Sequence, residues 1–361
     1  MNSKEKKIFF LYIIYSLVFL ICTTNYLSID DLTYKASQTD IINYLKISKF
    51  APYLAVNSDI AQHDAQRFLV PYIVGLVSFI TSFEIFFIYK ILSLLMIIVI
   101  MTINYYFSIK LNFDLKTSII FFSLFFFNPY TIRYNIFNPV MAHDLLFYIC
   151  CYFFSLGLIL RRNSLFVIAS YLTIFLRQTS IALVIGSIIF MIIKKNSFKN
   201  IFYYISFFII FFCITLYVGK MSSYREFPMR NAYAILNYDF NELFRLIKFL
   251  ALPLMSFLPL SLVIFGKIKK NIDFKTVITL LFVCMMMVGQ PILGGPDASS
   301  RNVVRIATLC YPIILMAIFY IYDFKYFFNK KIIFFLLLIF FHIWSLHPTF
   351  SSTNIFSFLR F

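Results

Sequence analysis

Residues 85–107, IFFIYKILSLLMIIVIMTINYYF, hold a single charged side chain, Lys90, in an otherwise apolar run. A helix that crosses the ~30 Å hydrocarbon core of a bilayer needs about 20 such residues. Comparable stretches recur before and after this one, and each is a candidate membrane helix. They cover residues 8–27, 68–83, 117–132, 145–160, 164–176, 178–193, 200–218, 249–266, 275–290, 303–322 and 332–346.

The composition of the whole chain agrees with this interpretation. Of its 361 residues, 61% are hydrophobic and 13% are charged, and the mean hydropathy is +0.87. A soluble domain carries roughly 25% charged residues, so this chain has too few to cover a surface in water. We therefore predict an all-α integral membrane protein that forms a single polytopic domain over residues 1–361, without a separate soluble domain.

The net charge of +17 could indicate a nucleic-acid partner or the orientation of a membrane protein. The basic residues stand in short runs between apolar stretches, which is typical of orientation and not of a groove that follows phosphates. We therefore expect membrane lipid around the chain and no nucleic acid as a partner.

The topology depends on two stretches. Residues 68–83 are few and contain Pro71 and Gly75, and Arg177 interrupts residues 164–193 near their centre. If 68–83 is a juxtamembrane or re-entrant helix and 164–193 is a hairpin, short loops on one side collect 17 of the 32 basic residues and 4 of the 15 acids. These basic residues are Lys4, Lys6, Lys7, Lys110, Lys116, Arg161, Arg162, Lys194, Lys195, Lys199, Lys267, Lys269, Lys270, Lys275, Lys325, Lys330 and Lys331.

The positive-inside rule places this basic side in the cytoplasm. We therefore predict about eleven crossings, a cytoplasmic N-terminus and an extracytoplasmic C-terminus, in a bacterial inner membrane. In the alternative topology, 68–83 crosses and 164–193 is one helix, and Lys110, Lys116, Arg161 and Arg162 then move outside.

Acidic residues concentrate in the first predicted outer loop. Asp30 and Asp31 follow the first apolar stretch, and Tyr34 comes shortly after them. A carboxylate at the rim of a helix bundle, partly shielded from water, is suited to act as a general base or a metal ligand. The alternative is that both acids are polar ends of a span, with Asp31 capping a following helix.

A second acid, Asp144, follows His143 at the predicted outer end of the fourth apolar stretch. Acids at such boundaries cost free energy and are often functional. An N-cap at the start of the span is the competing interpretation.

Basic side chains supply candidate anion sites. Arg177, beside Gln178 within an apolar run, needs an anion, carbonyl groups or a wet cavity, and a phosphate fits the geometry of its guanidinium. An ion pair with an acid of another loop is the alternative. Arg301 and Arg305 lie one helical turn apart and offer a second anion site.

His63 and His143 each precede an aspartate, but two such dipeptides do not have the spacing of a metal site. We interpret both as polar residues at the membrane interface.

The order of these motifs resembles the GT-C superfamily of membrane glycosyltransferases. Asp30-Asp31-x-x-Tyr34 looks like the superfamily's first-loop acidic motif, and HDAQRFLVPYIVG (63–75) looks like the stretch after it. MAHDLLFY (141–148) resembles the second acidic site, and FLRQTSIAL (175–183) is similar to a segment of several members. The resemblance covers residues 8–195, whereas 196–361 match in hydropathy alone. The first motif departs from the pattern in having Asp at position 31, where Glu is usual.

The resemblance implies an inverting transfer of a sugar from a polyprenyl-phosphate donor to a lipid-linked or surface-glycan acceptor on the outer face. Asp30 would be the general base, supported by Asp31, and Asp144 would orient the acceptor or hold a divalent ion. Arg177, with Arg301 and Arg305, would neutralise the departing phosphate. The substrate-binding residues implied are Tyr34, His63, Arg67, His143, Arg177, Gln178, Arg301 and Arg305.

No cofactor follows from the sequence with certainty, although the acidic sites leave room for a divalent cation, Mg or Mn. Two other functions stay open at this point. One is a polysaccharide polymerase of the O-antigen or EpsG-like type, which would rely on basic residues of the outer loops. The other is a transporter or flippase without catalytic activity, which would have charges well inside its spans and repeat symmetry between its halves.

Overall fold

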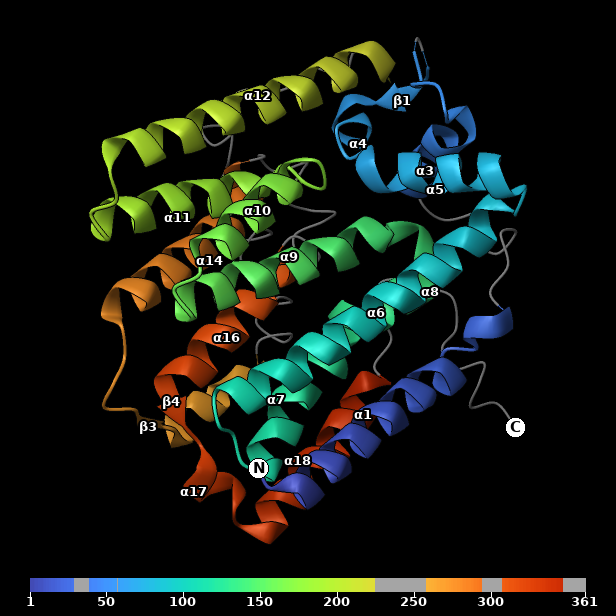
Figure 1. Cartoon of the computed structure of the whole chain (residues 1–361). Coiled ribbons are helices and arrows are strands. Elements are labelled where there is room, and N and C mark those ends of the chain that lie inside the picture. Colours follow the sequence, from blue (N-terminus) through green and yellow to red (C-terminus); the bar gives the residue numbers. More distant parts are fainter. Residues whose placement is uncertain (29–38, 57, 225–257, 294–306, 347–361) are drawn as a thin grey trace, which may run out of the picture.

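A computed structural model describes residues 1–28, 39–56, 58–224, 258–293 and 307–346 of the chain. The described residues are mostly helical (Figure 1). The longer helices are α1 (Ser3–Thr23), α3 (Thr39–Phe50), α5 (Leu69–Thr81), α6 (Ile85–Lys110), α7 (Leu115–Phe126), α9 (Ala142–Ile159), α10 (Asn163–Ile174), α11 (Ser180–Ile193), α12 (Phe198–Ser222), α14 (Phe274–Leu293), α16 (Tyr311–Ile321) and α18 (Lys331–Ser345). The short helical elements are η1 (Tyr26–Ser28), α4 (Gln62–Ala65), η2 (Pro129–Arg133), α8 (Tyr134–Phe137), η3 (Pro139–Met141), η5 (Leu258–Phe265) and α17 (Lys325–Phe328).

Almost no sheet is present among the described residues. Strand β1 (Ile60–Ala61) pairs in parallel with β2 (Ser223–Tyr224), and β3 (Lys267–Ile268) pairs in antiparallel with β4 (Tyr322–Asp323). Each pair joins segments that are distant in the sequence, so the strands hold helices together and form no layer of their own.

Five described segments are long and apolar enough to cross a bilayer, namely Ser3–Thr23, Ile85–Lys110, Leu115–Phe137, Pro139–Ile159 and Phe198–Met221. Six further apolar helices have 10–17 residues. At 1.5 Å per residue, about 17 residues extend about 26 Å, less than the ~30 Å core. The structure thus supports a helical membrane protein, and the predicted count of about eleven crossings stays a prediction.

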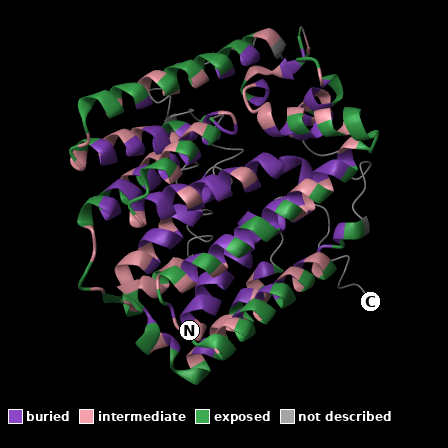
Figure 2. Cartoon of the chain, viewed as in Figure 1, coloured by how far each residue is buried: buried purple, intermediate pink, exposed green. Residues whose placement is uncertain are grey.

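Burial separates central helices from peripheral ones (Figure 2). In the most apolar 18 residues of Leu115–Phe137 and of Pro139–Ile159, 89% and 83% of the residues are buried. In the corresponding part of α12, 17% are buried. The exposed side chains of α12 are nevertheless large and apolar, as Phe202 and Phe207 illustrate. Apolar surface on this scale is unfavourable in water, and it fits a helix that faces lipid.

The sequence FNPYTIR ends α7 and starts a π-helical turn. Pro129 lacks an amide hydrogen and disfavours helix at the residue before it, and the Asn128 side chain accepts a hydrogen bond from the Tyr130 amide at 3.0 Å. This turn directs Arg133, which is 1% exposed, toward α1. Its guanidinium donates to the hydroxyl and the carbonyl of Thr23, both at 3.0 Å, and so satisfies the C-terminal end of α1.

The short stretch 68–83 forms α5, which packs against α3 where α6 begins (Figure 1). Gly75 permits this contact, because a Cβ atom there would lie 2.0 Å from the backbone oxygen of Ser48. The Ser48 hydroxyl donates to the Pro71 carbonyl at 2.8 Å and bonds the Tyr89 hydroxyl at 2.9 Å, which joins α3, α5 and α6. With 13 residues, α5 is about 20 Å long and too short to cross by itself.

Residues 164–193 form two helices, α10 and α11, which pack against each other. The connection between them contains Arg177, as the charge pattern predicts for a hairpin. The Arg177 amide bonds the Thr173 carbonyl at 3.1 Å, and the Arg177 carbonyl accepts from the Ser180 amide at 3.1 Å. Arg177 therefore lies in the turn between two helices and not within one.

The loops that carry the basic side of the sequence meet at the end of the molecule opposite α3 and α5 (Figure 1). Lys116 donates to the Asn329 carbonyl at 2.9 Å, and Asp273 accepts from Lys194 at 2.5 Å and lies 3.6 Å from Arg161. Burial acts to raise the pKa of Asp273, but the hydrogen bond and charge of Lys194 outweigh it and lower that pKa. Which membrane face this end occupies stays a prediction.

Candidate functional site

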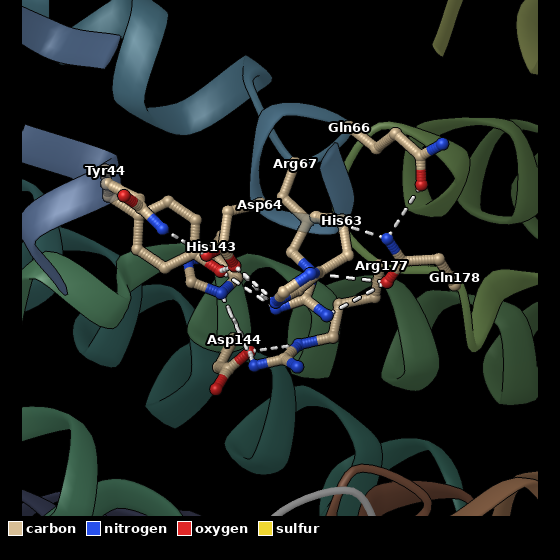
Figure 3. A network of polar contacts seen from close by, with 10 residues as sticks. Tyr44, His63, Asp64, Gln66, Arg67, His143, Asp144, Arg177 and Gln178 are labelled. Carbon is tan, nitrogen blue, oxygen red and sulfur yellow. Dashed lines mark hydrogen bonds and ion pairs between the residues drawn. The ribbon is translucent and has the colours of Figure 1, made fainter. Parts of the chain in front are cut away.

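Three stretches that are far apart in the sequence meet near α3 and α4 in one polar network (Figure 3). They are residues 63–67 in and after α4, residues 143–144 in the first turn of α9, and residues 177–178 in the connection between α10 and α11. Each stretch was singled out by the sequence. The network lies at the end of the molecule away from the basic loops (Figure 1).

A buried ion pair lies at the inner part of the network. Arg177 Nε donates to Asp144 Oδ1 at 2.5 Å, and Arg177 Nη2 contacts the same oxygen. The two side chains are 3% and 2% exposed. His143 Nε2 lies 3.4 Å from both Arg177 Nη2 and Asp144 Oδ1. Among the alternatives weighed for Arg177, the ion pair with an acid of another segment is therefore present.

The N-cap interpretation of Asp144 is wrong. The N-cap of α9 is Met141, and Asp144 lies within the first helical turn. A carboxylate in that turn is favoured by the positive end of the helix dipole. Asp144 thus holds Arg177 at the start of α9.

Gln178 joins the α10–α11 connection to α4. Its Oε1 accepts from Arg67 Nε at 3.2 Å and from Arg67 Nη2 at 3.0 Å. Its Nε2 donates to the His63 carbonyl and to Gln66 Oε1, both at 2.9 Å. Because the amide oxygen accepts and the amide nitrogen donates, this single side chain fixes the position of Arg67 relative to Arg177.

Asp64 is the second carboxylate of the network and is fully buried. Its Oδ2 accepts from Asn43 Nδ2 at 2.8 Å, and its Oδ1 accepts from the Tyr44 hydroxyl at 3.0 Å. Arg67 Nη1 is 3.4 Å from the same Oδ1 and only 2.9 Å from the Tyr44 oxygen. These hydrogen bonds to helix α3 fix the orientation of the Asp64 carboxylate.

Tyr44 connects the two carboxylates. Its ring meets the His143 ring edge to face with centroids 4.6 Å apart, and its hydroxyl bonds Asp64. Burial raises the pKa of Tyr44, although the charge of Arg67 acts in the opposite direction. The hydroxyl therefore stays protonated at neutral pH and acts as a donor to the carboxylate.

Six of the predicted site residues belong to this network, namely His63, Arg67, His143, Asp144, Arg177 and Gln178. Five others lie outside the described residues, namely Asp30, Asp31, Tyr34, Arg301 and Arg305. The sequence analysis missed Asn43, Tyr44, Asp64 and Gln66. Asp64 and Gln66 lie within the quoted HDAQR stretch, which was a usable signal, but nothing in the sequence around Asn43 and Tyr44 set them apart.

A small apolar pocket adjoins the network, because its lining includes Ala65 and Phe68 on either side of Gln66 and Arg67. The other lining residues come from α3, the segment after it, α5 and α12, and they are Ile47, Tyr53, Leu54, Ala55, Tyr72 and Val218. The charged network and a small apolar hollow are therefore next to each other.

Comparison with models of protein families, with curated proteins and with solved structures found no match to this chain. No function can therefore be inferred from a shared fold, and only the residues of the site indicate what the protein does.

Proposed function

We propose that the protein is a GT-C-type glycosyltransferase that moves a sugar from a polyprenyl-phosphate donor to a lipid-linked or surface-glycan acceptor. Its fold would be a bundle of about eleven spans, with residues 8–195 as the shared module and α5 as the juxtamembrane helix of the first outer loop. The reaction would take place on the extracytoplasmic face of a bacterial inner membrane.

The observation that carries this proposal is the meeting of the 63–67, 143–144 and 177–178 stretches in one polar network (Figure 3). These stretches are three of the four motifs on which the resemblance depends. Two guanidinium groups, Arg67 and Arg177, are held there by hydrogen bonds inside a protein that faces lipid. Fixed positive charge of this kind is costly to bury and is expected where an anion must be bound.

In the proposed reaction, the acceptor hydroxyl attacks the anomeric carbon as the bond from that carbon to the phosphate oxygen breaks. Attack from the face opposite the phosphate inverts the anomeric configuration. Negative charge develops on the departing polyprenyl phosphate, and Arg177 and Arg67 stabilise it, because fixed cations in a site of low polarity act without reorganisation. Asp144 orients Arg177.

The acceptor hydroxyl loses its proton in the same step, and a base must accept it. We assign that base to Asp30, supported by Asp31, with Tyr34, Arg301 and Arg305 as further substrate contacts. These five assignments follow from the resemblance, and the residues lie outside the described part of the chain. His63, His143 and Gln178 complete the substrate-facing set.

The transporter alternative loses support from two of the charged residues that suggested it. Arg177 lies in a turn between helices. Lys90 lies near the start of α6, where its Nζ donates to the Leu27 carbonyl at 3.2 Å and stands over the Tyr26 ring. Both charges therefore lie near helix ends and do not mark a path through the bundle. The polymerase alternative depends on loops outside the described residues and gains no support.

The test is transfer of radiolabelled sugar by purified full-length protein from a panel of polyprenyl-phosphate sugars into a lipid extract. For Asp30→Asn we expect transfer to fall by about 10²–10⁴-fold, the usual contribution of a general base, while donor binding persists. The matched control is Asp59→Asn, an exposed acid of the same loop, which should leave transfer unchanged. Undiminished transfer by Asp30→Asn, or no transfer from any donor, would contradict the proposal.

A further inference from the structure

Three side chains that can ligate a metal ion lie together at the outer side of the polar network. Asp40 is in the first turn of α3, and His63 and Asp64 are in α4. One ligand atom from each residue can be chosen so that all of them lie within 4.8 Å of one another. The helices α3 and α4 pack directly on each other, so this arrangement depends on the fold and not on spacing in the sequence.

The buried member of the set is already oriented in the way that metal-binding carboxylates are. The side chain of Asp64 is 1% exposed, and both of its oxygens accept hydrogen bonds from α3, one from Asn43 and one from Tyr44. Such outer hydrogen bonds fix the direction of a ligating carboxylate and tune its affinity for metal. The His63 side chain is 49% exposed, so an ion could enter from that side and keep coordination positions for water or substrate.

The local charges also favour a cation. Asp40 and Asp64 bring two carboxylates together, and Asp64 faces the guanidinium of Arg67. That guanidinium is held at 2.9–3.2 Å by Tyr44 and Gln178, while its distance to Asp64 is 3.4 Å. A divalent ion bound there would add positive charge beside the buried Asp64 carboxylate, whose burial costs free energy.

We propose that Asp40, His63 and Asp64 form a binding site for a divalent transition-metal ion of the Mn²⁺ or Zn²⁺ type. An imidazole nitrogen combined with carboxylate oxygens suits these ions better than Mg²⁺ or Ca²⁺, which prefer oxygen ligands alone. The ion would join α3 to α4 beside Arg67. This inference goes beyond the proposed transfer reaction and does not depend on it.

The experiment uses the full chain in detergent, stripped of metal with a chelator and given Mn²⁺, Zn²⁺ or Mg²⁺ alone, without any sugar donor. Bound metal is measured by mass spectrometry after desalting, and affinity by calorimetry. We expect near-stoichiometric binding of Mn²⁺ or Zn²⁺ by the unchanged protein, and weaker binding of Mg²⁺. Metal should also raise the melting temperature, because it binds the folded chain.

Three variants separate this site from adventitious binding. His63→Ala and Asp40→Asn should each weaken Mn²⁺ or Zn²⁺ binding about tenfold or more, and should lose the metal-dependent rise in melting temperature. Asp59→Asn, an exposed acid between α3 and α4, should bind as the unchanged protein does. The metal-free melting temperatures of the variants show whether they fold.

Equal metal affinity in His63→Ala and the unchanged protein would overturn the proposal, as would the absence of binding in the unchanged protein. Binding of Mg²⁺ as tight as that of Mn²⁺ would overturn the role of the imidazole. Failure of the sugar-transfer assay would leave the metal measurements standing, because they need no donor.

Discussion

The ion pair between Asp144 and Arg177 contributes little to stability but fixes the position of the guanidinium group. Both side chains are almost completely buried, so each has lost most of its hydration. The attraction between them offsets that loss only while both charges are present, and removal of one partner leaves the other charge in a site of low polarity. Such a pair is a weak source of stability and a strong constraint on where the guanidinium points.

We predict that Asp144→Asn destabilises the protein by about 3–5 kcal/mol, the usual cost of breaking a buried pair by removing one partner. Arg177→Gln should have a comparable effect. The double variant should lose clearly less than the sum of the two single losses, because neither charge then remains. Denaturant unfolding in detergent measures the three free energies. Additive losses would show that the two side chains do not interact as the structure indicates.

At the scale of the element, the contact between α3 and α5 positions the whole outer part of the network. α3 carries Tyr44, which bonds Asp64, and Ser48, which bonds the first turn of α5. Arg67 lies two residues before Leu69, the first residue of α5. The close approach at Gly75 therefore influences the position of the guanidinium although Gly75 touches no residue of the site.

We predict that Gly75→Ala destabilises the protein by about 1–3 kcal/mol, because a Cβ atom 2.0 Å from the Ser48 oxygen must push the two helices apart. Gly289→Ala in α14 is the matched control, since a Cβ atom there meets nothing within 4 Å. Alanine favours helix over glycine, so the control should be neutral or stabilised by up to about 1 kcal/mol. Thermal unfolding in detergent compares them, and equal melting temperatures would refute the predicted clash.

At the scale of the whole molecule, the polar network and the lysine-rich loops lie at opposite ends of the helices (Figure 1). The polar network with α3, α4 and α5 lies at one end, and the lysine-rich loops around Lys116, Lys194 and Asp273 lie at the other (Figure 1). The helices between them expose apolar side chains, most clearly along α12 (Figure 2). This division is compatible with the predicted topology, in which the site and the basic loops lie on opposite membrane faces.

We predict that the two ends face opposite sides of the membrane. In a background where the six cysteines are replaced by serine, Asp59→Cys should react with an impermeant maleimide on intact cells. Asn271→Cys should react only after the membrane is opened, because it lies among the basic loops. The reverse pattern would place the network on the cytoplasmic side, and labelling of both positions on intact cells would exclude a crossing between them.

Several features of this protein could be predicted from the sequence because they depend on local composition. Long apolar runs predict membrane helices, and Arg177 predicts the break between α10 and α11, since a guanidinium cannot remain within a lipid-facing helix. The clustering of lysines between the runs predicts the common end of the basic loops. The sequence also singles out the stretches 63–67, 143–144 and 177–178, because each places charged or polar side chains beside an apolar run.

The tertiary structure decided which side chains touch. It paired Asp144 with Arg177 where the sequence left an N-cap, a phosphate site and an ion pair with another loop open. It also brought Asn43 and Tyr44 to Asp64 from a stretch of α3 that has no distinguishing motif. Hydropathy and charge report how each segment relates to water and lipid, which is a local property. Contacts between residues far apart in the chain depend on how helices pack, and small features such as the missing Cβ of Gly75 control that packing.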